Sequence, residues 1–395
     1  MKKIWFAVTV LFVSLMLAGC QESDTKSFKV EVVSINGSIL LSEDIIFNED
    51  DVSDVVELID QALDLDYSTS DYGTFVNGIG EFYPTEHEAT YNYYFALYIN
   101  DEMSTTGIDN IVLTDGMKIS FVETTMLDQI DLKVDQIIQL FLTNYYDTYI
   151  NDQQFEHFVL ASVKQLNLHG YESPILTQSS IDFPVENLLR ENAANSFKTA
   201  IFESAFNLDL TTTQSALSGF EVMGTYDGMA LLNALLLVDG SQTQKDSVLS
   251  ALLTFAEGQS YLDADYAGMM LLALSPYKDD SSTQNAIEFM TEYIQSELTV
   301  DGVNAYGSAN ASSTASVIIG LVAQGINPRS EAYAIEGIDL IEALLAFEIN
   351  GAFQWQLSDE QADMMFSTPQ AFSALVAYKI YRDVRGNPAF NLFDF

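Results

Sequence analysis

The sequence predicts a multidomain α+β protein, in which a small domain of strands and one helix precedes a double ring of helices. Two observations lead to this fold class. The chain changes near residue 126 from alternating strand patterns to helical spacing. Beyond that point, apolar helices alternate with amphipathic ones in a loose repeat. Because 48% of the residues are hydrophobic and 12% are aromatic, both parts can hold a core despite the high acidity.

The start of the chain is typical of a secretory signal peptide that ends in a lipidation site. A basic start and an apolar run, 4–17, lead to the sequence Leu-Ala-Gly-Cys, which ends at Cys20. The run is shorter than the roughly 20 residues that a spanning helix needs. We therefore expect a signal peptide over 1–19, a tether over 20–27 and lipid attachment at Cys20. The protein would then face outward from the cytoplasmic membrane or lie in the periplasm.

The mature chain is strongly acidic. Without Lys2 and Lys3 it keeps 13 basic residues against 57 acidic ones, a formal charge of −44. A surface of this sign repels phosphate backbones and anionic headgroups, so nucleic acid is excluded as a partner. We expect the protein to reach the membrane through its lipid alone. The single cysteine also excludes a disulfide within the chain, so stability must come from burial.

Strand patterns fill most of the first predicted domain, 28–125. Apolar and polar side chains alternate over 28–35, and an Asn-Gly turn follows. One helix among several strands in a domain of about 100 residues indicates an α+β fold. The predicted elements are strands over 28–35, 38–41, 75–79, 91–100 and 117–123 and a helix over 52–63.

The second predicted domain, 126–395, has helical spacing throughout. Segments such as 228–237 and 315–323 are apolar on nearly all sides, which is typical of buried helices, and amphipathic segments alternate with them. Gly228 and Gly268 lie 40 residues apart in matching contexts. Helices are expected over 136–142, 155–166, 197–206, 226–237, 248–256, 266–274, 286–298, 315–323, 335–347 and 371–382.

Repeats of about 40–55 residues, each with a buried and an outer helix, indicate a helical repeat array. About six such pairs fit the domain, enough to close into a double ring of inner and outer helices. An open solenoid or an irregular bundle is the alternative.

Short motifs recur in both domains. The helical domain has Asp-Ala-Asp-Tyr-Ala-Gly-Met at 263–269, Asn-Ala-Ser-Ser-Thr-Ala at 310–315 and Phe-Ser-Thr-Pro-Gln-Ala at 366–371, and the first domain has patterned segments at 75–80, 93–101 and 107–116. These motifs resemble those of the cobalamin carriers transcobalamin and intrinsic factor. The helical domain is similar to the α/α toroids of the terpene cyclase and prenyltransferase superfamily, to which the helical domain of these carriers belongs. The first domain resembles their β-grasp-like module, which has an unassigned bacterial form.

The chain departs from the carriers in three ways. The small domain comes first here, whereas the animal carriers place the ring first. Met364 stands where the second ring motif would have an asparagine, and Tyr94 or Phe95 stands where the aromatic strand would have a tryptophan. The resemblance therefore implies the fold, a β-grasp-like domain followed by an α/α toroid, and leaves the ligand open.

What the resemblance implies is capture of cobalamin or a related corrinoid between the two domains. Polar contacts would come from the rim of the ring and aromatic cover from the small domain. Two alternatives stay open for the polar residues: Asp265 can be the N-cap of a helix that begins at Tyr266, and the Ser-Thr pairs can also be caps. Trp355 packs in a loop or stacks on a ligand. The candidate ligand-binding residues are Asp265, Asn310, Ser313, Thr314, Ser367, Thr368, Gln370, Tyr94 and Phe95.

Known enzyme motifs of these folds are incomplete in the sequence. A zinc prenyltransferase binds its metal through Asp, Cys and His, and the one cysteine is the expected lipidation site. A class II cyclase needs Asp-x-Asp-Asp, and Tyr266 occupies the last position. The three histidines have no spacing for a metal site, and Gly-x-Ser-x-Gly, His-Glu-x-x-His and phosphate-loop motifs do not occur. We expect no catalytic residue and no metal site, although paired carboxylates for glycoside hydrolysis stay open.

The sequence thus leads to an expected function with two alternatives. We expect a lipid-anchored extracytoplasmic binding protein without a covalent cofactor, whose ligand is a corrinoid or another large amphipathic small molecule. A membrane importer is the expected partner for delivery. The first alternative is a surface module that binds protein or glycan. The second is an enzyme with an unrecognised acidic site.

Overall fold

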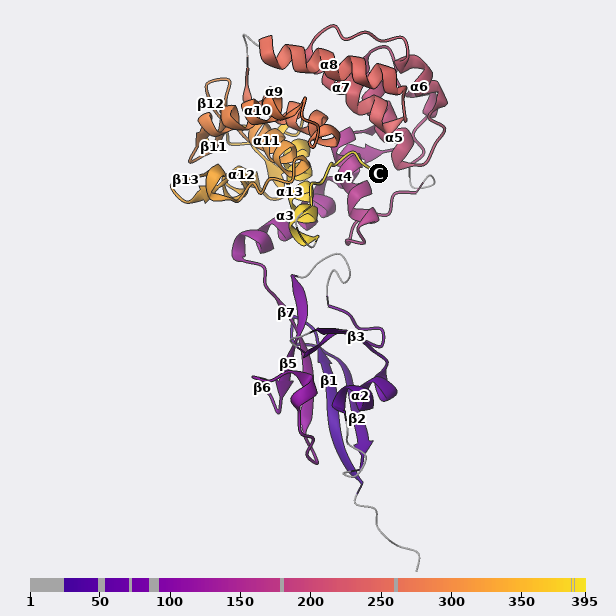
Figure 1. The fold of residues 1–395 in the computed structure, drawn as a ribbon, viewed down its shortest axis with the longest axis vertical. Helices are drawn as coiled ribbons and strands as arrows, with labels where there is room; N and C mark the ends of the chain where they lie inside the picture. Colours follow the sequence, from indigo (N-terminus) through magenta and orange to yellow (C-terminus); the bar gives the residue numbers. More distant parts are fainter. Residues whose placement is uncertain are drawn as a thin grey trace, which may run out of the picture. The chain divides into compact units, whose positions relative to one another are not determined.

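The computed structural model in Figure 1 describes residues 25–48, 54–70, 73–84, 92–177, 181–258, 262–384, 386 and 388–395. The expected signal peptide, the expected lipidation site Cys20 and residue Tyr91 lie outside the described residues. The chain forms two compact units: Met126 ends the first, and the second continues from Leu127. The predicted fold class, multidomain α+β, is confirmed. No helix among the described residues is both long and apolar enough to cross a membrane.

The first unit is a mixed five-stranded sheet with one helix packed on it, a β-grasp-like arrangement (Figure 1). The strand order is β2-β1-β7-β5-β6, in which β1 and β7 are parallel and the other neighbours antiparallel. Asp54 caps helix α2, which buries Val56 and Ile59 in the same core as Phe28 and Val30. The elements are β1 (Lys26–Val33), β2 (Ile39–Phe47), α2 (Val55–Leu63), β3 (Leu65–Ser70), β4 (Gly73–Ile79), β5 (Tyr93–Ile99), β6 (Glu102–Met103), η2 (Ile108–Asn110) and β7 (Lys118–Thr125).

Strand β3 was not predicted from the sequence. It pairs with β4 in a separate two-stranded hairpin, and most of its residues are exposed. A strand that is exposed on both faces carries no alternation of apolar and polar side chains, so it lacks the pattern on which strand prediction depends.

The second unit is a double layer of helices closed into a ring (Figure 1). Each inner helix packs against the next along the chain, and α13 packs back against α4, so the ring closes and is not an open solenoid. The inner helices are α4 (His157–Leu168), α5 (Ala193–Ala205), α7 (Thr225–Leu237), α9 (Ala264–Leu274), α11 (Ala311–Ala323) and α13 (Ser367–Asp383). The outer helices are α3 (Gln129–Tyr149), α6 (Thr211–Leu217), α8 (Gln242–Gly258), α10 (Gln284–Ser296) and α12 (Leu340–Leu345).

Short hairpins precede several of these helices, and they explain one wrong prediction. The segment 335–347 was predicted as one helix, but its first half is a hairpin and α12 begins at Leu340. Glu336 and Gly337 have φ angles of 55° and 86°, the paired positive values of a tight hairpin turn. The hairpin strands are β8 (Ile150–Asn151), β9 (Gln154–Phe155), β10 (Leu298–Thr299), β11 (Gly302–Ala305), β12 (Ser308–Ala309), β13 (Ala334–Ile335), β14 (Ile338–Asp339), β15 (Glu348–Ile349) and β16 (Ala352–Phe353), and short 3-10 turns are η3 (Val185–Asn187), η4 (Ser275–Tyr277) and η5 (Glu331–Tyr333).

Candidate functional site

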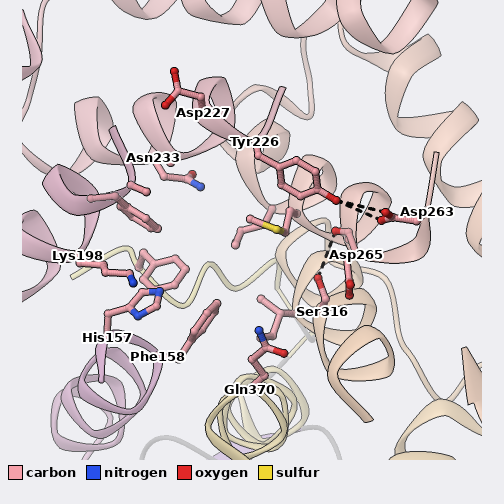
Figure 2. Close-up of a pocket in the computed structure, with 18 of the residues that line it drawn as sticks. His157, Phe158, Lys198, Tyr226, Asp227, Asn233, Asp263, Asp265, Ser316 and Gln370 are labelled. Carbon is pink, nitrogen blue, oxygen red and sulfur yellow. Dashed lines mark hydrogen bonds between the residues drawn. The ribbon is translucent and has the colours of Figure 1, made fainter. Parts of the chain in front are cut away.

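A cavity of about 660 Å³ lies in the centre of the helical ring. All six inner helices line it, mostly with residues from their N-terminal halves, and Figure 2 shows their side chains converging on it. The apolar lining consists of aromatic rings and small or flexible side chains, with a few polar groups among them. Concave apolar surfaces with a few convergent polar groups are typical of small-molecule sites.

The aromatic floor of the cavity includes a residue from the last segment of the sequence. The Phe393 ring lies 5.0 Å from the Phe197 ring and 5.7 Å from the Phe158 ring, measured between centroids. The Gln165 side chain on α4 holds this segment by donating to the carbonyl oxygens of Leu392 and Asp394, at 3.0 and 2.9 Å. Phe393 and Asn233 also line a second cavity of about 380 Å³.

One wall of the cavity is acidic and begins with Asp263. This residue is the N-cap of α9, since its Oδ1 accepts a hydrogen bond from the backbone nitrogen of Tyr266 at 2.7 Å. The Tyr226 hydroxyl on α7 donates to the same carboxylate at 3.3 Å (Figure 2). The Asp263 carboxylate therefore links the start of α9 to α7 at the edge of the cavity.

Asp265 is the second acid on this wall, and its side chain is free of the capping role. The Tyr306 hydroxyl donates to Asp265 Oδ2 at 3.0 Å. Burial raises the pKa of the Asp265 carboxyl above its usual range, and the nearby Asp263 charge acts in the same direction. No basic side chain forms an ion pair with Asp265 anywhere in the described ranges. The alternative in which Asp265 caps α9 is therefore wrong.

Tyr306 reaches Asp265 from an unfavourable backbone conformation. Its φ angle is 56°, and Gly307 follows at 95°, so the two residues form the tight turn between β11 and β12. A bulky residue at positive φ is uncommon, because its side chain crowds the backbone. Such strain concentrates at functional sites, and here it places a 61% exposed tyrosine against the acidic wall.

The opposite side of the cavity carries His157 and Lys198, as Figure 2 shows. The Nδ1 atom of His157 lies 2.8 Å from Glu156 Oε1. Burial acts to raise the pKa of Glu156, but the His157 and Lys198 charges outweigh it and hold that pKa below its usual range. Glu156 therefore offsets part of the positive charge on this side.

Gln370, in the first turn of α13, offers an unused hydrogen-bond acceptor to the cavity. Its Oε1 atom is buried and receives no hydrogen bond from any described residue. Buried polar atoms are nearly always paired in proteins, so an unpaired one beside a cavity is consistent with a bound partner there.

Five of the predicted contact residues are buried at helix starts and do not face the cavity. Asn310 caps α11 by accepting from Ser313 N at 2.9 Å, and Thr314 Oγ1 accepts from Val303 N at 3.0 Å. Thr368 Oγ1 likewise accepts from Phe353 N at 2.9 Å. These contacts favour the alternative in which the Ser-Thr pairs act at helix starts, and none of the five residues lines the cavity. The five residues are Asn310, Ser313, Thr314, Ser367 and Thr368.

Asp363 supplies the side chain that Met364 lacks. The Asp363 carboxylate accepts from the backbone nitrogens of Met365 and Ser367, both at 2.9 Å, and so organises the start of α13. Asp363 was not predicted, because it stands one residue before the position at which the motif would have its asparagine.

The predicted aromatic residues of the first unit lie on β5. Phe95 is 7% exposed and packs edge-on against Phe121 at 6.5 Å, so it belongs to the core of its own unit and cannot act as an exposed lid. Tyr94 is half-buried. Trp355, in the loop before α13, is 37% exposed, and its carbonyl oxygen accepts from Ala311 N at 3.0 Å. Of the nine predicted contact residues, Asp265 and Gln370 line the cavity.

Comparisons with known proteins identify part of the first unit. Residues 53–124 match a family described as a domain of unknown function, DUF4430. A crystal structure from Ruminococcus gnavus ATCC 29149, named a "putative metal binding protein", is 16% identical in sequence. It covers 26% of this chain and 99% of that chain, with a TM-score of 0.22, which is too low to carry an argument. Among curated proteins, none matches the sequence.

The described residues also offer no group of three or more His, Cys, Asp or Glu side chains placed to hold a metal ion.

Proposed function

We propose that the protein binds an amphipathic small molecule in the cavity of its helical ring. The observation that carries the proposal is the cavity itself, whose volume of about 660 Å³ falls within the range of about 300–1,000 Å³ that is usual for ligand pockets. Its lining combines an aromatic floor with separate polar groups, which would orient a ligand of mixed character. We propose binding without catalysis.

The specific ligand that we propose is a corrinoid, and this rests on the resemblance to the cobalamin carriers. A corrinoid with its axial ligands is large for the cavity, so one edge of it would enter between the inner helices. Asp265 and Gln370 could accept hydrogen bonds from the amide groups on that edge. Asn310 and Thr314 would not take part, because they are fully buried.

We further propose that the protein acts at the outer face of the cytoplasmic membrane or in the periplasm, held by lipid on Cys20, and that a membrane importer receives the ligand. Cys20→Ser should release the protein from the membrane fraction into the supernatant. If the variant stays with the membranes after a high-salt wash, the anchoring proposal is wrong.

The binding proposal is tested by gel filtration of the mature protein with cobalamin. We expect the red chromophore to elute with the protein. Met269→Trp should abolish this, because Met269 lines the cavity and a larger ring there would fill it. Met103→Trp is the matched control, since Met103 is 61% exposed on the first unit. Circular dichroism would show that both variants are folded.

One observation favours the alternative of a protein- or glycan-binding surface. Apolar side chains are exposed just before and at the starts of two inner helices: Met223 is 84% exposed, Met365 is 74% and Phe366 is 56%. Exposed apolar groups of this size are common at interaction sites. The same experiment separates the two functions, because a surface module would elute without colour in the wild type and in both variants.

A further inference from the structure

We propose that the ligand group bound at the acidic wall is a cationic amine, held by the Asp265 carboxylate while an apolar body lies on the aromatic floor. This inference rests on the proposed function and narrows its ligand class.

The first step concerns charge. Asp227, Asp263 and Asp265 line the cavity, and none of them forms an ion pair with a basic side chain in the part of the chain that the structure describes. The lining has two basic side chains on the other side, His157 and Lys198, and His157 contacts the Glu156 carboxylate at 2.8 Å. The lining therefore carries an excess of negative charge, which a cation would balance.

The second step concerns hydrogen bonds. An ionised carboxylate can accept about four hydrogen bonds. Two hydroxyl groups approach the Asp265 carboxylate: that of Tyr306, which donates at 3.0 Å, and that of Ser313. This leaves about half of its acceptor capacity unused. The Gln370 Oε1 atom is buried beside the same cavity without a donor. Unfilled acceptors thus line the cavity on α9 and α13, and an ammonium group supplies up to three donors from one atom.

The third step concerns the rest of the ligand. Phe158, Phe197 and Phe393 form a continuous group of rings, with centroid separations of 5.0 and 5.7 Å to Phe393. Aromatic faces favour an apolar body and also attract a nearby cation. A molecule with an aromatic or aliphatic body and one amine therefore matches the floor and the wall together.

An anionic ligand at Lys198 is the competing arrangement. It is less favourable, because Lys198 is exposed to solvent and its charge already acts on Glu156. An anion in the cavity would also face three carboxylates without counter-charges.

The experiment compares three probes that share one ring system: naphthylethylamine, naphthylethanol and naphthylacetate. Their affinities for the mature protein would be measured by equilibrium dialysis at neutral pH. We expect the amine to bind about ten- to a hundredfold more tightly than the alcohol, the range for a hydrogen bond to a charged group. The acetate should bind most weakly.

Two variants distinguish amine binding at Asp265 from the general attraction of an acidic protein for cations. Asp265→Asn should reduce the amine affinity to that of the alcohol and leave the alcohol affinity unchanged. Asp279→Asn is the matched control, because it removes the same charge from a side chain that is 92% exposed and outside the cavity. It should leave all three affinities unchanged.

The outcomes distinguish this inference from the proposed function. If the three probes bind equally, or if Asp265→Asn and Asp279→Asn weaken the amine alike, the cationic ligand class is wrong and the binding cavity stands. If no probe binds to the wild type, the proposed function itself fails for ligands of this size.

Discussion

Two acids that stand two residues apart in the sequence have different roles in this protein. Asp263 is 7% exposed, and its carboxylate accepts hydrogen bonds from the backbone of α9 and from the Tyr226 hydroxyl. Asp265 contributes nothing to the cap and faces the cavity. The sequence suggested a choice between cap and ligand contact for Asp265 alone, and the structure assigns the cap to Asp263 and places Asp265 in the cavity lining.

Substitution of each acid should therefore change stability differently. Asp263→Ala should lower the free energy of unfolding by about 1 kcal/mol, the usual effect of losing an N-cap. Asp265→Asn should not lower the free energy of unfolding and should raise it slightly at neutral pH. Since the folded-state pKa of Asp265 is raised, its ionisation disfavours the fold, and this cost develops as pH rises from the unfolded pKa through the folded one. Urea denaturation would measure both, and a loss for Asp265→Asn equal to that for Asp263→Ala would contradict the assignment.

The affinity for the amine should increase with pH. The groups that face Asp265 are the Asp263 carboxylate, the Tyr306 hydroxyl and the nearby Tyr226 hydroxyl, and burial is the main cause of its raised pKa. A cation binds the ionised carboxylate, so naphthylethylamine affinity should rise as pH increases through the raised pKa of Asp265 and then level off. Titration calorimetry at a series of pH values would show this. Affinity that falls over that range, or stays flat, would argue against Asp265 as the cation partner.

At the scale of elements, the ring depends on one close helix crossing between α9 and α11. A Cβ added to Gly268 would lie 2.5 Å from the carbonyl oxygen of Ser316, and one added to Gly320 would overlap the backbone of Gly268. The two glycines allow the backbones to approach. On α9 this contact lies about one helical turn after Asp265.

Gly320→Ala should therefore lower the free energy of unfolding by about 1–3 kcal/mol, as overpacking of a filled core usually does. Gly219→Ala is the control, because the nearest atom to its added Cβ is 3.7 Å away. Thermal or urea unfolding would compare the two. Equal stability of both variants would show that the crossing can relax without cost.

The helices and strands could be predicted where side-chain patterns reflect burial. The inner helices α7, α9 and α11 are buried on nearly every side, and their apolar sequences indicated this directly. Helix α6 is too polar to carry that signal, and the hairpin before α12 depends on positive φ angles at Glu336 and Gly337. The turn could not be predicted from a glutamate at position 336, because glutamate rarely adopts a positive φ angle.

At the scale of the whole helical unit, a buried ion network joins α3, the first outer helix, to α13, the last inner one. Arg382 on α13 donates to Asp383 at 2.5 Å and to Asp135 on α3 at 2.9 Å. Lys379 contacts the same two acids, each at 3.1 Å. Burial acts to raise the pKa of Asp383, but the Arg382 and Lys379 charges outweigh it and hold that pKa low. The network thus fastens the two ends of the ring.

Arg382→Met should lower the free energy of unfolding by about 3–5 kcal/mol, because it removes one of the two cations from a buried network and leaves its acids incompletely paired. Lys278→Met removes a cation from an exposed pair with Asp279 and should change stability by less than about 1 kcal/mol. Urea denaturation of both variants provides the comparison. Similar small losses would mean that the network does not hold the ring closed.

The site could be predicted only in part from the sequence. Asp265 stood out as an acid on an apolar helix, and Gln370 lay in a recognised motif. Phe393 and Tyr306 gave no comparable signal, because one comes from the last segment of the sequence and the other from a turn that usually holds glycine or asparagine. Their positions depend on the closure of the ring, which brings together residues from all six inner helices.

The central claim is that the ring cavity is the ligand site, and a crystal structure of the mature protein grown with naphthylethylamine tests it most directly. We expect the naphthyl ring between the six inner helices, against Phe158 and Phe393, with the amine nitrogen within hydrogen-bond distance of the Asp265 carboxylate. An empty cavity, with the amine bound elsewhere on the protein, would contradict the claim.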